Sequence, residues 1–447
     1  MGRPRFGTDG VRGVANADLT PELATALGRA SARVLAARTF LLGRDTRRSG
    51  PMLQAALAAG LAAEGADVVD LGVLPTAGLA FCAAQRRVPG AVVSASHNPF
   101  GDNGIKLFGP EGTKLAAADE AAIEAALDGG ADLRPGTAPV GASVGSLSAD
   151  PAGAAAYRRH LVGALDGRRL DGLTVVVDCA HGAASGVAPD VIADLGAAVV
   201  PTACHPDGTN INDGCGSTQP AAVARAVVEH GADLGLAFDG DADRLIAVDH
   251  SGAVVDGDAL LALFAVDMAE RGELAGGAVV VTVMSNLGFH HAMARRGIAV
   301  RQTPVGDRQV LAALDAEGLA LGGEQSGHIV FRRRATTGDG ILTGLLVADA
   351  VVRSGRPLAD LVSGLVERLP QVLVNVTVED PHRLAGAGGV WAAVADVEAE
   401  LGDGGRVLLR PSGTEPLVRV MVEAPTEDQA AEAARRLVKV VEGELGG

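Results

Sequence analysis

Three carboxylates crowd into five residues near the middle of the chain, where Asp239, Asp241 and Asp243 directly follow the apolar residues 234–238. Mutual repulsion makes such a cluster costly unless a hard cation neutralises it, and an all-oxygen ligand set suits Mg2+. An EF-hand loop would need glycine and glutamate where this chain has Arg244 and His250. The spacing therefore predicts a magnesium site at the end of a buried strand.

A second polar loop follows the apolar residues 90–93 and reads Ser94-Ala-Ser-His-Asn-Pro99, with Lys106 shortly after it. A serine beside a histidine, with a lysine nearby, suggests a nucleophile with acid–base help. A polar turn in which Ser94 or Ser96 bonds only its own backbone is the alternative. The two serines would face the same way on an extended strand, so spacing does not choose between them.

The loop Gly323-Glu-Gln-Ser-Gly-His328 carries polar side chains at alternate positions. If the segment is extended, Glu324, Ser326 and His328 point to one side and offer donors and acceptors to a hydroxyl-bearing ligand such as a sugar. A β-turn with a surface glutamate is the alternative.

A last polar loop, Arg410-Pro-Ser-Gly-Thr-Glu-Pro416, links two apolar runs near the C-terminus. A guanidinium fork, two hydroxyls and an accessible glycine N–H suit a phosphate group, and Arg419 on the following run could assist. A plain hairpin loop would also use proline and glycine, but it has no need of arginine, serine and threonine together.

Apolar runs that alternate with helical segments predict βαβ units and largely parallel sheets. We expect three mixed α/β sandwich domains of similar topology over residues 1–150, 151–250 and 251–368, and a smaller α+β domain over residues 369–447. Thr20-Pro21-Glu22 is typical of a helix start. Residues 128–153 are dense in Gly, Pro, Ala and Ser, which predicts an irregular connection.

Composition excludes several classes of function. The 447 residues carry a net charge of −16 and only 2% aromatic residues, which disfavours a nucleic-acid partner. No apolar run is long enough to span a membrane or to form a secretory signal, so we expect a cytoplasmic protein. The four cysteines show no zinc-site spacing and are expected to be free thiols.

Five motifs in one order carry a resemblance to a known family: Phe6-Gly-Thr-Asp-Gly-Val-Arg-Gly13, Ser94–Pro99, Asp239–Arg244, Gly323–His328 and Arg410–Pro416. In this order they resemble the α-D-phosphohexomutase superfamily over the whole chain. Gln325 and the stretch from Ser412 to Glu415 are most similar to the branch that acts on glucosamine phosphates. The resemblance implies four domains around a central cleft, with one loop contributed by each.

The resemblance also implies a role for each loop. Ser96 would be the serine that carries a phosphoryl group, and one Mg2+ per subunit would be held by its phosphate oxygen with Asp239, Asp241 and Asp243. The basic residues of the reaction would be Arg12, His97, Lys106 and Arg244, with Lys106 the candidate for acid–base help. The sugar hydroxyls would be held by Glu324 and Ser326, with His328 alongside. The non-reacting phosphate would be clamped by Arg410, Ser412, Gly413, Thr414 and Arg419.

The implied reaction interconverts glucosamine 6-phosphate and glucosamine 1-phosphate through a sugar 1,6-bisphosphate, supplying UDP-N-acetylglucosamine for cell-wall precursors. The implied partners are a phosphosugar substrate and, by the habit of the family, a second copy of the chain, with no nucleic acid or membrane. Three alternatives stay open: a sister mutase acting on glucose or mannose phosphates, a phosphatase of the haloacid-dehalogenase type with Asp239 as nucleophile, and a non-catalytic sugar-phosphate sensor.

Overall fold

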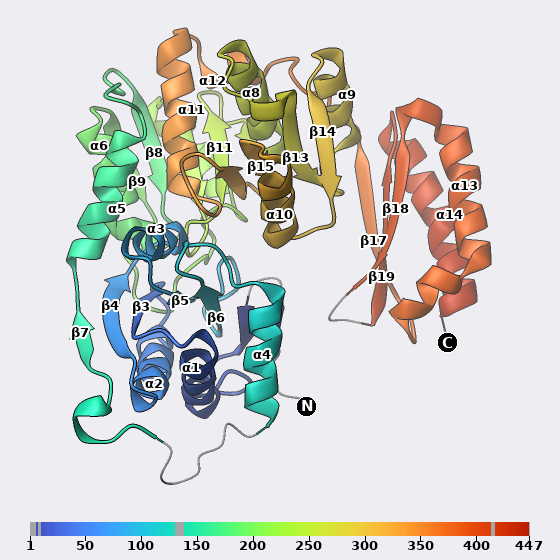
Figure 1. The fold of residues 1–447 in the computed structure, drawn as a ribbon. Helices are drawn as coiled ribbons and strands as arrows, with labels where there is room; N and C mark the ends of the chain where they lie inside the picture. Colours follow the sequence, from blue (N-terminus) through green and yellow to red (C-terminus); the bar gives the residue numbers. More distant parts are fainter. Residues whose placement is uncertain (1–5, 8–9, 130–137, 413–415, 447) are drawn as a thin grey trace. The chain divides into compact units, whose positions relative to one another are not determined.

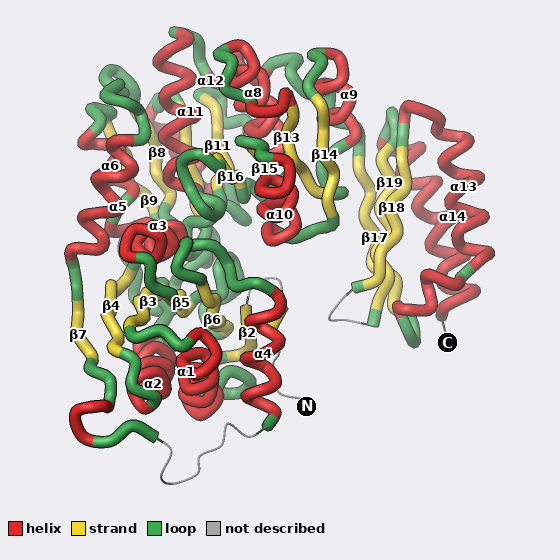
Figure 2. Tube along the Cα trace, viewed as in Figure 1, coloured by secondary structure: helices red, strands yellow, loops and turns green. Residues whose placement is uncertain are grey.

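The computed structural model describes residues 6–7, 10–129, 138–412 and 416–446 (Figure 1). They form two compact units, one from residues 1–283 and 298–363, the other from residues 284–297 and 364–447. The first contains three mixed β-sheets with their helices, and the second contains a three-stranded antiparallel sheet with helices (Figure 2). This agrees with the expected α/β domains and smaller α+β domain. No helix in the described ranges has the length and apolar character needed to cross a bilayer.

The first sheet has seven strands in the order β1 (Phe6–Gly7), β2 (Gly10–Val14), β6 (Asp102–Phe108), β5 (Gly90–Val93), β3 (Thr39–Arg44), β4 (Asp67–Val73) and β7 (Leu147–Ala149). Strands β5, β3, β4 and β7 are parallel, whereas β6 and β2 run antiparallel to their neighbours.

Helices cover both faces of this sheet. The core on one face is shared with α1 (Pro21–Leu35), α2 (Gly50–Ala63) and α4 (Ala117–Asp128). The other face packs against α3 (Thr76–Arg86), whose Leu79 lies over β3 and β5. Helix α1 begins as predicted, because the Thr20 hydroxyl accepts a hydrogen bond from the Leu23 N–H at 3.3 Å.

One expectation for this region is wrong. Within the supposed irregular connection, Leu147–Ala149 forms strand β7, and Leu147 pairs with Val68 of β4. All three residues of β7 are exposed, so this short edge strand has no apolar side that a sequence pattern could reveal. A short 3-10 turn, Gly141–Ser143, precedes it. Residues 130–137 lie outside the described ranges.

The second sheet has the order β12 (Val254–Val255), β11 (Leu245–Asp249), β10 (Leu234–Phe238), β8 (Thr174–Asp178) and β9 (Ala198–Thr202). The third has the order β14 (Ala299–Thr303), β13 (Ala278–Thr282), β15 (Leu321–Gly323) and β16 (Ile329–Phe331). The helices of this part are α5 (Ala152–Gly163), α6 (Ala188–Asp194), α7 (Ala221–His230), α8 (Gly257–Glu270), α10 (Asp307–Glu317), α11 (Gly340–Ser354) and α12 (Leu358–Val362).

The three sheets share one type of strand connection, and this connection positions the candidate loops. In each sheet a parallel strand ends in a polar loop, and the chain then returns as an antiparallel neighbour: β5 to β6, β10 to β11 and β15 to β16. The sheets are therefore mixed, as expected, and contain both parallel and antiparallel strands. Ligand sites in open α/β sheets gather at the carboxyl ends of strands, and all three loops leave such an end.

The second unit has the predicted order of strand, helix, strand, strand and helix: β17 (Gln371–Thr377), α13 (Gly388–Leu401), β18 (Arg406–Pro411), β19 (Leu417–Glu423) and α14 (Glu427–Leu445). It also includes α9 (Leu287–Arg295), which begins beside this sheet. The buried Glu423 carboxylate fixes that helix start by accepting hydrogen bonds from Leu287 N–H at 2.8 Å and from the Asn286 amide at 3.1 Å.

A buried carboxylate caps α11 in the first unit. Asp339 accepts hydrogen bonds from the Leu342 N–H at 2.9 Å and from the Tyr157 hydroxyl at 2.9 Å. Burial raises the pKa of Asp339 to about 6, although both hydrogen bonds act to lower it. The folded protein therefore disfavours the ionised form relative to the unfolded chain, whose carboxyl has its ordinary lower pKa.

We predict that Asp339→Asn becomes more stable relative to wild type as the pH rises. Below about pH 4 both forms present a neutral capping group, whereas above about pH 6 only the wild type carries the buried charge. A pKa raised by about two units corresponds to roughly 3 kcal/mol. Urea unfolding of both proteins at pH 4.5, 6 and 7.5 measures the difference, and a difference that does not change with pH would refute the prediction.

Candidate active site

The backbone at Ser96 separates the two serines of the first loop. Ser96 has a φ of 54°, so the segment is not extended and the two hydroxyls serve different partners. Ser94 Oγ accepts a hydrogen bond from the Ser96 N–H at 3.0 Å and donates one to the buried Asp45 at 2.6 Å. Ser96 Oγ donates to Asp239 Oδ2 at 2.5 Å. Ser94 thus shapes the loop, and Ser96 presents its hydroxyl to the carboxylate cluster.

A buried arginine holds this serine loop in place. Arg47 pairs with Asp45 at 2.8 Å, and its guanidinium donates to the Ser96 carbonyl at 2.9 Å and the Asn98 carbonyl at 2.7 Å. Further carbonyl partners are Asp102 at 3.0 Å and Pro99. The Asn212 amide also donates to the Ser96 carbonyl, at 2.9 Å.

Sequence reasoning missed Asp45, Arg47 and Asn212. A signal was available for the first two, because they follow the apolar strand β3 just as the other polar loops follow their strands. Asn212 lies in an irregular segment with no comparable pattern.

The carboxylate cluster is buried and compact. Asp239, Asp241 and Asp243 each offer an oxygen, and these atoms all lie within 4.8 Å of one another. Asp241 Oδ2 accepts hydrogen bonds from Lys106 Nζ at 2.6 Å and from the Thr76 hydroxyl at 2.5 Å. Lys106 Nζ also lies 3.3 Å from Asp243 Oδ2. Lys106 is thus an ion-pair partner of the cluster, and Thr76 is a contact that sequence reasoning missed.

The donor set fits a hard cation. Asp241 Oδ1 and Asp243 Oδ1 are buried and accept no hydrogen bond from any described residue. Burial, followed by the negative charges of Asp243 and Asp241, raises the pKa of Asp239 well above its usual range. Orphaned carboxylate oxygens and repelling neighbours are what a divalent cation would satisfy, and oxygen ligands suit Mg2+.

A neutral imidazole and two guanidiniums flank the serine. His97 Nδ1 lies 3.3 Å from Ser96 Oγ. Burial, followed by the positive charges of Arg244 and Arg12, lowers the pKa of His97 to about 4, so this imidazole is uncharged at neutral pH. Arg12 lies on β2, opposite Gly104 of β6. The backbone N–H of Arg244 donates to Asp239 Oδ1 at 3.1 Å, and the Arg244 guanidinium Nε lies 3.8 Å from Asp243 Oδ1. The two arginines supply positive charge beside the nucleophile without a third charge from His97.

The third loop is a turn rather than an extended segment, which corrects the expectation of three side chains aimed one way. Gly323 and Ile329 pair at the ends of β15 and β16, and residues 324–328 form the connection between them. Glu324 Oε1 accepts a hydrogen bond from the Gly306 N–H at 3.0 Å, and Ser326 Oγ lies 3.4 Å from Glu324 Oε2. These two polar groups therefore lie side by side within the turn.

His328 lies beside the carboxylate cluster. It is buried, and its Nδ1 lies 3.8 Å from Asp243 Oδ2. The Gly338 N–H donates to His328 Nε2 at 3.2 Å, which leaves the proton on the nitrogen that faces Asp243. Burial alone would raise the pKa of Asp243, but Lys106, His328 and Arg244 more than offset it and hold that pKa well below its usual range.

The candidate phosphate clamp lies in the second unit. Arg410 of β18 and Arg419 of β19 are direct cross-strand partners. Two guanidiniums at facing positions concentrate positive charge at one place on the sheet, which suits an anionic ligand. Ser412 is buried, and its N–H donates to the Leu417 carbonyl at 2.9 Å. Gly413 and Thr414 lie outside the described residues.

Comparison with known proteins identifies the family to which a chain with this site geometry belongs. Residues 3–133, 155–252 and 256–369 match phosphoglucomutase/phosphomannomutase α/β/α domains I, II and III, and residues 373–440 match the C-terminal domain. The chain is also 55% identical over 448 residues to the phosphoglucosamine mutase of Salinispora tropica, covering 99% of this chain and 98% of the relative. The chain belongs to the phosphoglucomutase/phosphomannomutase family.

Solved structures share the architecture of this family. A phosphoglucomutase/phosphomannomutase family protein from Burkholderia thailandensis has a TM-score of 0.82 at 26% identity, with 99% of this chain and 97% of that chain covered. An N-acetylphosphoglucosamine mutase from Aspergillus fumigatus, in complex with GlcNAc-6P and magnesium, has a TM-score of 0.70 at 20% identity, covering 99% and 96%. The second likeness concerns the fold alone.

Proposed function

We propose that the chain is a phosphoglucosamine mutase that interconverts glucosamine 6-phosphate and glucosamine 1-phosphate. The observation that carries the proposal is the Ser96 hydroxyl, 2.5 Å from a buried cluster of three carboxylates, in a chain 55% identical to a phosphoglucosamine mutase over almost its whole length. The family assignment favours this function over the aspartyl phosphatase and the sensor.

The chemistry consists of two phosphoryl transfers. The phosphorylated Ser96 gives its phosphoryl group to the free hydroxyl of the sugar phosphate, so that the Oγ–P bond breaks as a sugar O–P bond forms. The bisphosphate then reverses its orientation in the site, and its other phosphoryl group is transferred to Ser96. In the first transfer a proton passes from the sugar hydroxyl to the departing Ser96 oxygen, and in the second a proton passes from the Ser96 hydroxyl to the departing sugar oxygen. We assign this proton transfer to Lys106, which as the ammonium ion paired with Asp241 can donate a proton, and which can accept one only after it has released its own.

Positioning and electrostatics carry most of the catalysis of a phosphoryl transfer. Arg12 and Arg244 offset negative charge on the moving group and leave the neighbouring His97 neutral, as its lowered pKa indicates. One Mg2+ per subunit, held by Asp239, Asp241, Asp243 and a phosphoserine oxygen, would supply further charge neutralisation.

The rest of the substrate is held by two further groups of residues. Glu324 and Ser326 bind the sugar, with His328 behind them against Asp243. The non-reacting phosphate is bound by the second unit through Arg410, Ser412, Gly413, Thr414 and Arg419. One phosphate clamp must bind the bisphosphate in both of its orientations.

We also propose that the protein is a cytoplasmic homodimer. Sedimentation velocity measures the number of chains in the assembly.

We predict a clear preference for the amino sugar. A carboxylate such as Glu324 forms a stronger, charge-assisted bond with an ammonium group than with a hydroxyl. We expect kcat/KM for glucosamine 1-phosphate to exceed that for glucose 1-phosphate and mannose 1-phosphate by at least about tenfold. The assay contains Mg2+ and a sugar 1,6-bisphosphate, and Ser96→Ala protein measures contaminating activity. A preference for glucose or mannose phosphate would assign the chain to a sister mutase.

A further inference from the structure

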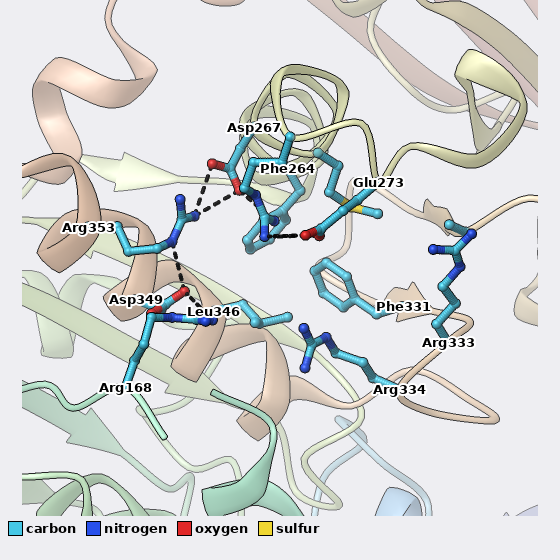
Figure 3. Close-up of a pocket in the computed structure, with 13 residues that line it drawn as sticks. Arg168, Phe264, Asp267, Glu273, Phe331, Arg333, Arg334, Leu346, Asp349 and Arg353 are labelled. Carbon is cyan, nitrogen blue, oxygen red and sulfur yellow. Dashed lines mark hydrogen bonds and ion pairs between the residues drawn. The ribbon is translucent and has the colours of Figure 1, made fainter. Parts of the chain in front are cut away.

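A cavity of about 360 Å³ lies in the first unit, between the segment that follows α5, helices α8 and α11, and the open end of the β15–β16 hairpin (Figure 3). None of the residues assigned above to catalysis or substrate binding lines it. The hairpin carries Glu324 and His328 at its turn, whereas Ala320 and Phe331 line the cavity at its other end. The cavity is therefore separate from the candidate active site.

Guanidinium groups dominate the cavity wall. Its lining includes five arginines and three carboxylates, and a fourth carboxylate, Asp166, lies beside two of these arginines, which leaves one surplus positive charge. The whole chain carries a net charge of −16, so this local cluster opposes the overall field. A cluster of one sign in a concave site attracts the opposite charge and raises its local concentration.

Three of the arginines are already neutralised by the three carboxylates. Arg168 binds Asp349 at 2.7 Å, and Arg353 bridges Asp349 at 2.9 Å and Asp267 at 2.8 Å. The last pairings join Arg271 to Asp267 at 2.9 Å and to Glu273 at 2.9 Å. This wall of the cavity is a closed network with no charge left over.

The surplus charge lies on Arg333, which is exposed, and among the described residues the only carboxylate paired with Arg334 is itself exposed. Figure 3 shows Arg333 on the side of the cavity opposite Arg353 and Asp267, and Arg334 below Phe331, with the two guanidinium groups pointing in different directions. Arg333 makes no hydrogen bond or ion pair with any residue in the described ranges. Arg334 donates to the Ala164 carbonyl and lies 3.4 Å from Asp166, a carboxylate that is 63% exposed and lies outside the cavity lining. Within the described part of the chain, neither guanidinium has a buried counter-charge.

The floor between the two walls is apolar. Phe264 and Phe331 pack edge to face with ring centroids 4.8 Å apart, and Met268 and Leu346 complete the surface. A bare inorganic anion would use the guanidiniums and leave this floor uncovered. A ligand with both a phosphate group and a ring would use the two surfaces together.

We infer that this cavity is a second ligand site, which binds a small organic phosphate with a ring, of the nucleotide class. Its phosphate group is held by Arg333 and Arg334, and its ring lies on Phe331 and Leu346. Ligand binding at this site does not depend on the mutase reaction, so this inference and the proposed function can be tested separately.

The test is titration calorimetry of the full chain with ADP, adenosine and inorganic phosphate, in buffer without Mg2+. We expect ADP to bind at one site, at least about tenfold more tightly than adenosine, which lacks the charge, and than phosphate, which lacks the ring. Saturating glucosamine 6-phosphate should leave ADP binding unchanged. Binding of ADP no tighter than phosphate, or displacement of ADP by the sugar phosphate, would overturn the inference.

Matched variants locate the bound probe. Arg333→Gln and Arg334→Gln should each weaken ADP binding by about tenfold, the loss of one guanidinium–phosphate contact. Arg225→Gln removes an exposed arginine from α7, remote from the cavity lining, and should leave ADP affinity unchanged. Arg333 has no partner to lose among the described residues, so Arg333→Gln should keep the wild-type unfolding midpoint. Equal ADP affinity in Arg333→Gln and wild type would refute the assignment.

Discussion

Gly240→Ala is expected to lower kcat of the mutase reaction by at least about a hundredfold, because a displacement of reacting groups by about 1 Å has that effect. A Cβ at Gly240 would lie 2.5 Å from the Ser96 carbonyl oxygen, 2.8 Å from Ile211 Cδ1 and 3.0 Å from Asn212 Nδ2. The first contact is with backbone and cannot be relieved by a side-chain rotation. The methyl group must therefore push the serine loop and the carboxylate loop apart, which lengthens the 2.5 Å contact between Ser96 and Asp239.

A matched glycine substitution controls for the added methyl group itself. Gly163 ends α5, and nothing lies within 4 Å of the position that a Cβ would take there, so Gly163→Ala should retain wild-type kcat. We expect Gly240→Ala also to lose about 1–3 kcal/mol of unfolding free energy, as overpacked positions do. Wild-type kcat in Gly240→Ala would show that the two loops do not need this close approach.

Arg47→Met is expected to reduce both stability and activity. Arg47 is fully buried, and its removal leaves the buried Asp45 without its counter-charge. It also takes away one of the two side-chain donors of the Ser96 and Asn98 carbonyls, to which, among the described residues, only the Asn212 amide would still donate. Breaking one side of a buried ion pair typically costs about 3–5 kcal/mol. Because the lost bonds fix the backbone on both sides of the nucleophile, kcat should also fall by about a hundredfold or more.

The neighbouring arginine provides the control. Arg48 is exposed, and Arg48→Met changes the same charge and a similar volume beside the same loop. It should keep wild-type kcat and lose little unfolding free energy, since exposed substitutions usually change it by less than about 0.5 kcal/mol. Chemical denaturation and steady-state kinetics separate the two effects. Normal kcat in a destabilised Arg47→Met protein would mean that Arg47 supports the fold but does not position Ser96.

The sequence was informative where chemistry is concentrated in a short segment. The cluster of Asp239, Asp241 and Asp243 could be predicted because three repelling carboxylates after an apolar strand need a counter-charge. The start of α1 at Thr20 could be predicted for a similar reason, since a hydroxyl, a proline and an acid occupy the first turn together.

The sequence was uninformative where a residue acts on a distant backbone. The partners of Arg47 are carbonyls about fifty residues further along the chain, and no spacing rule connects them. Likewise, spacing could not separate Ser94 from Ser96. The difference lies in the left-handed backbone of Ser96, in the bond from Ser94 to Asp45, and in the bonds from Arg47 and Asn212 to the Ser96 carbonyl. The alternation of Glu324, Ser326 and His328 suggested an extended segment, but tight pairing of Gly323 with Ile329 makes it a turn.

The central claim is that Ser96 carries the phosphoryl group. Its most direct test is peptide mass spectrometry of the wild-type protein after incubation with Mg2+ and glucose 1,6-bisphosphate, before and after addition of glucosamine 6-phosphate. We predict one acid-stable phosphate, on Ser96, that is lost to the sugar when substrate is added. A hydroxylamine-labile phosphate on Asp239, or mutase turnover with Ser96 never phosphorylated, would contradict this claim.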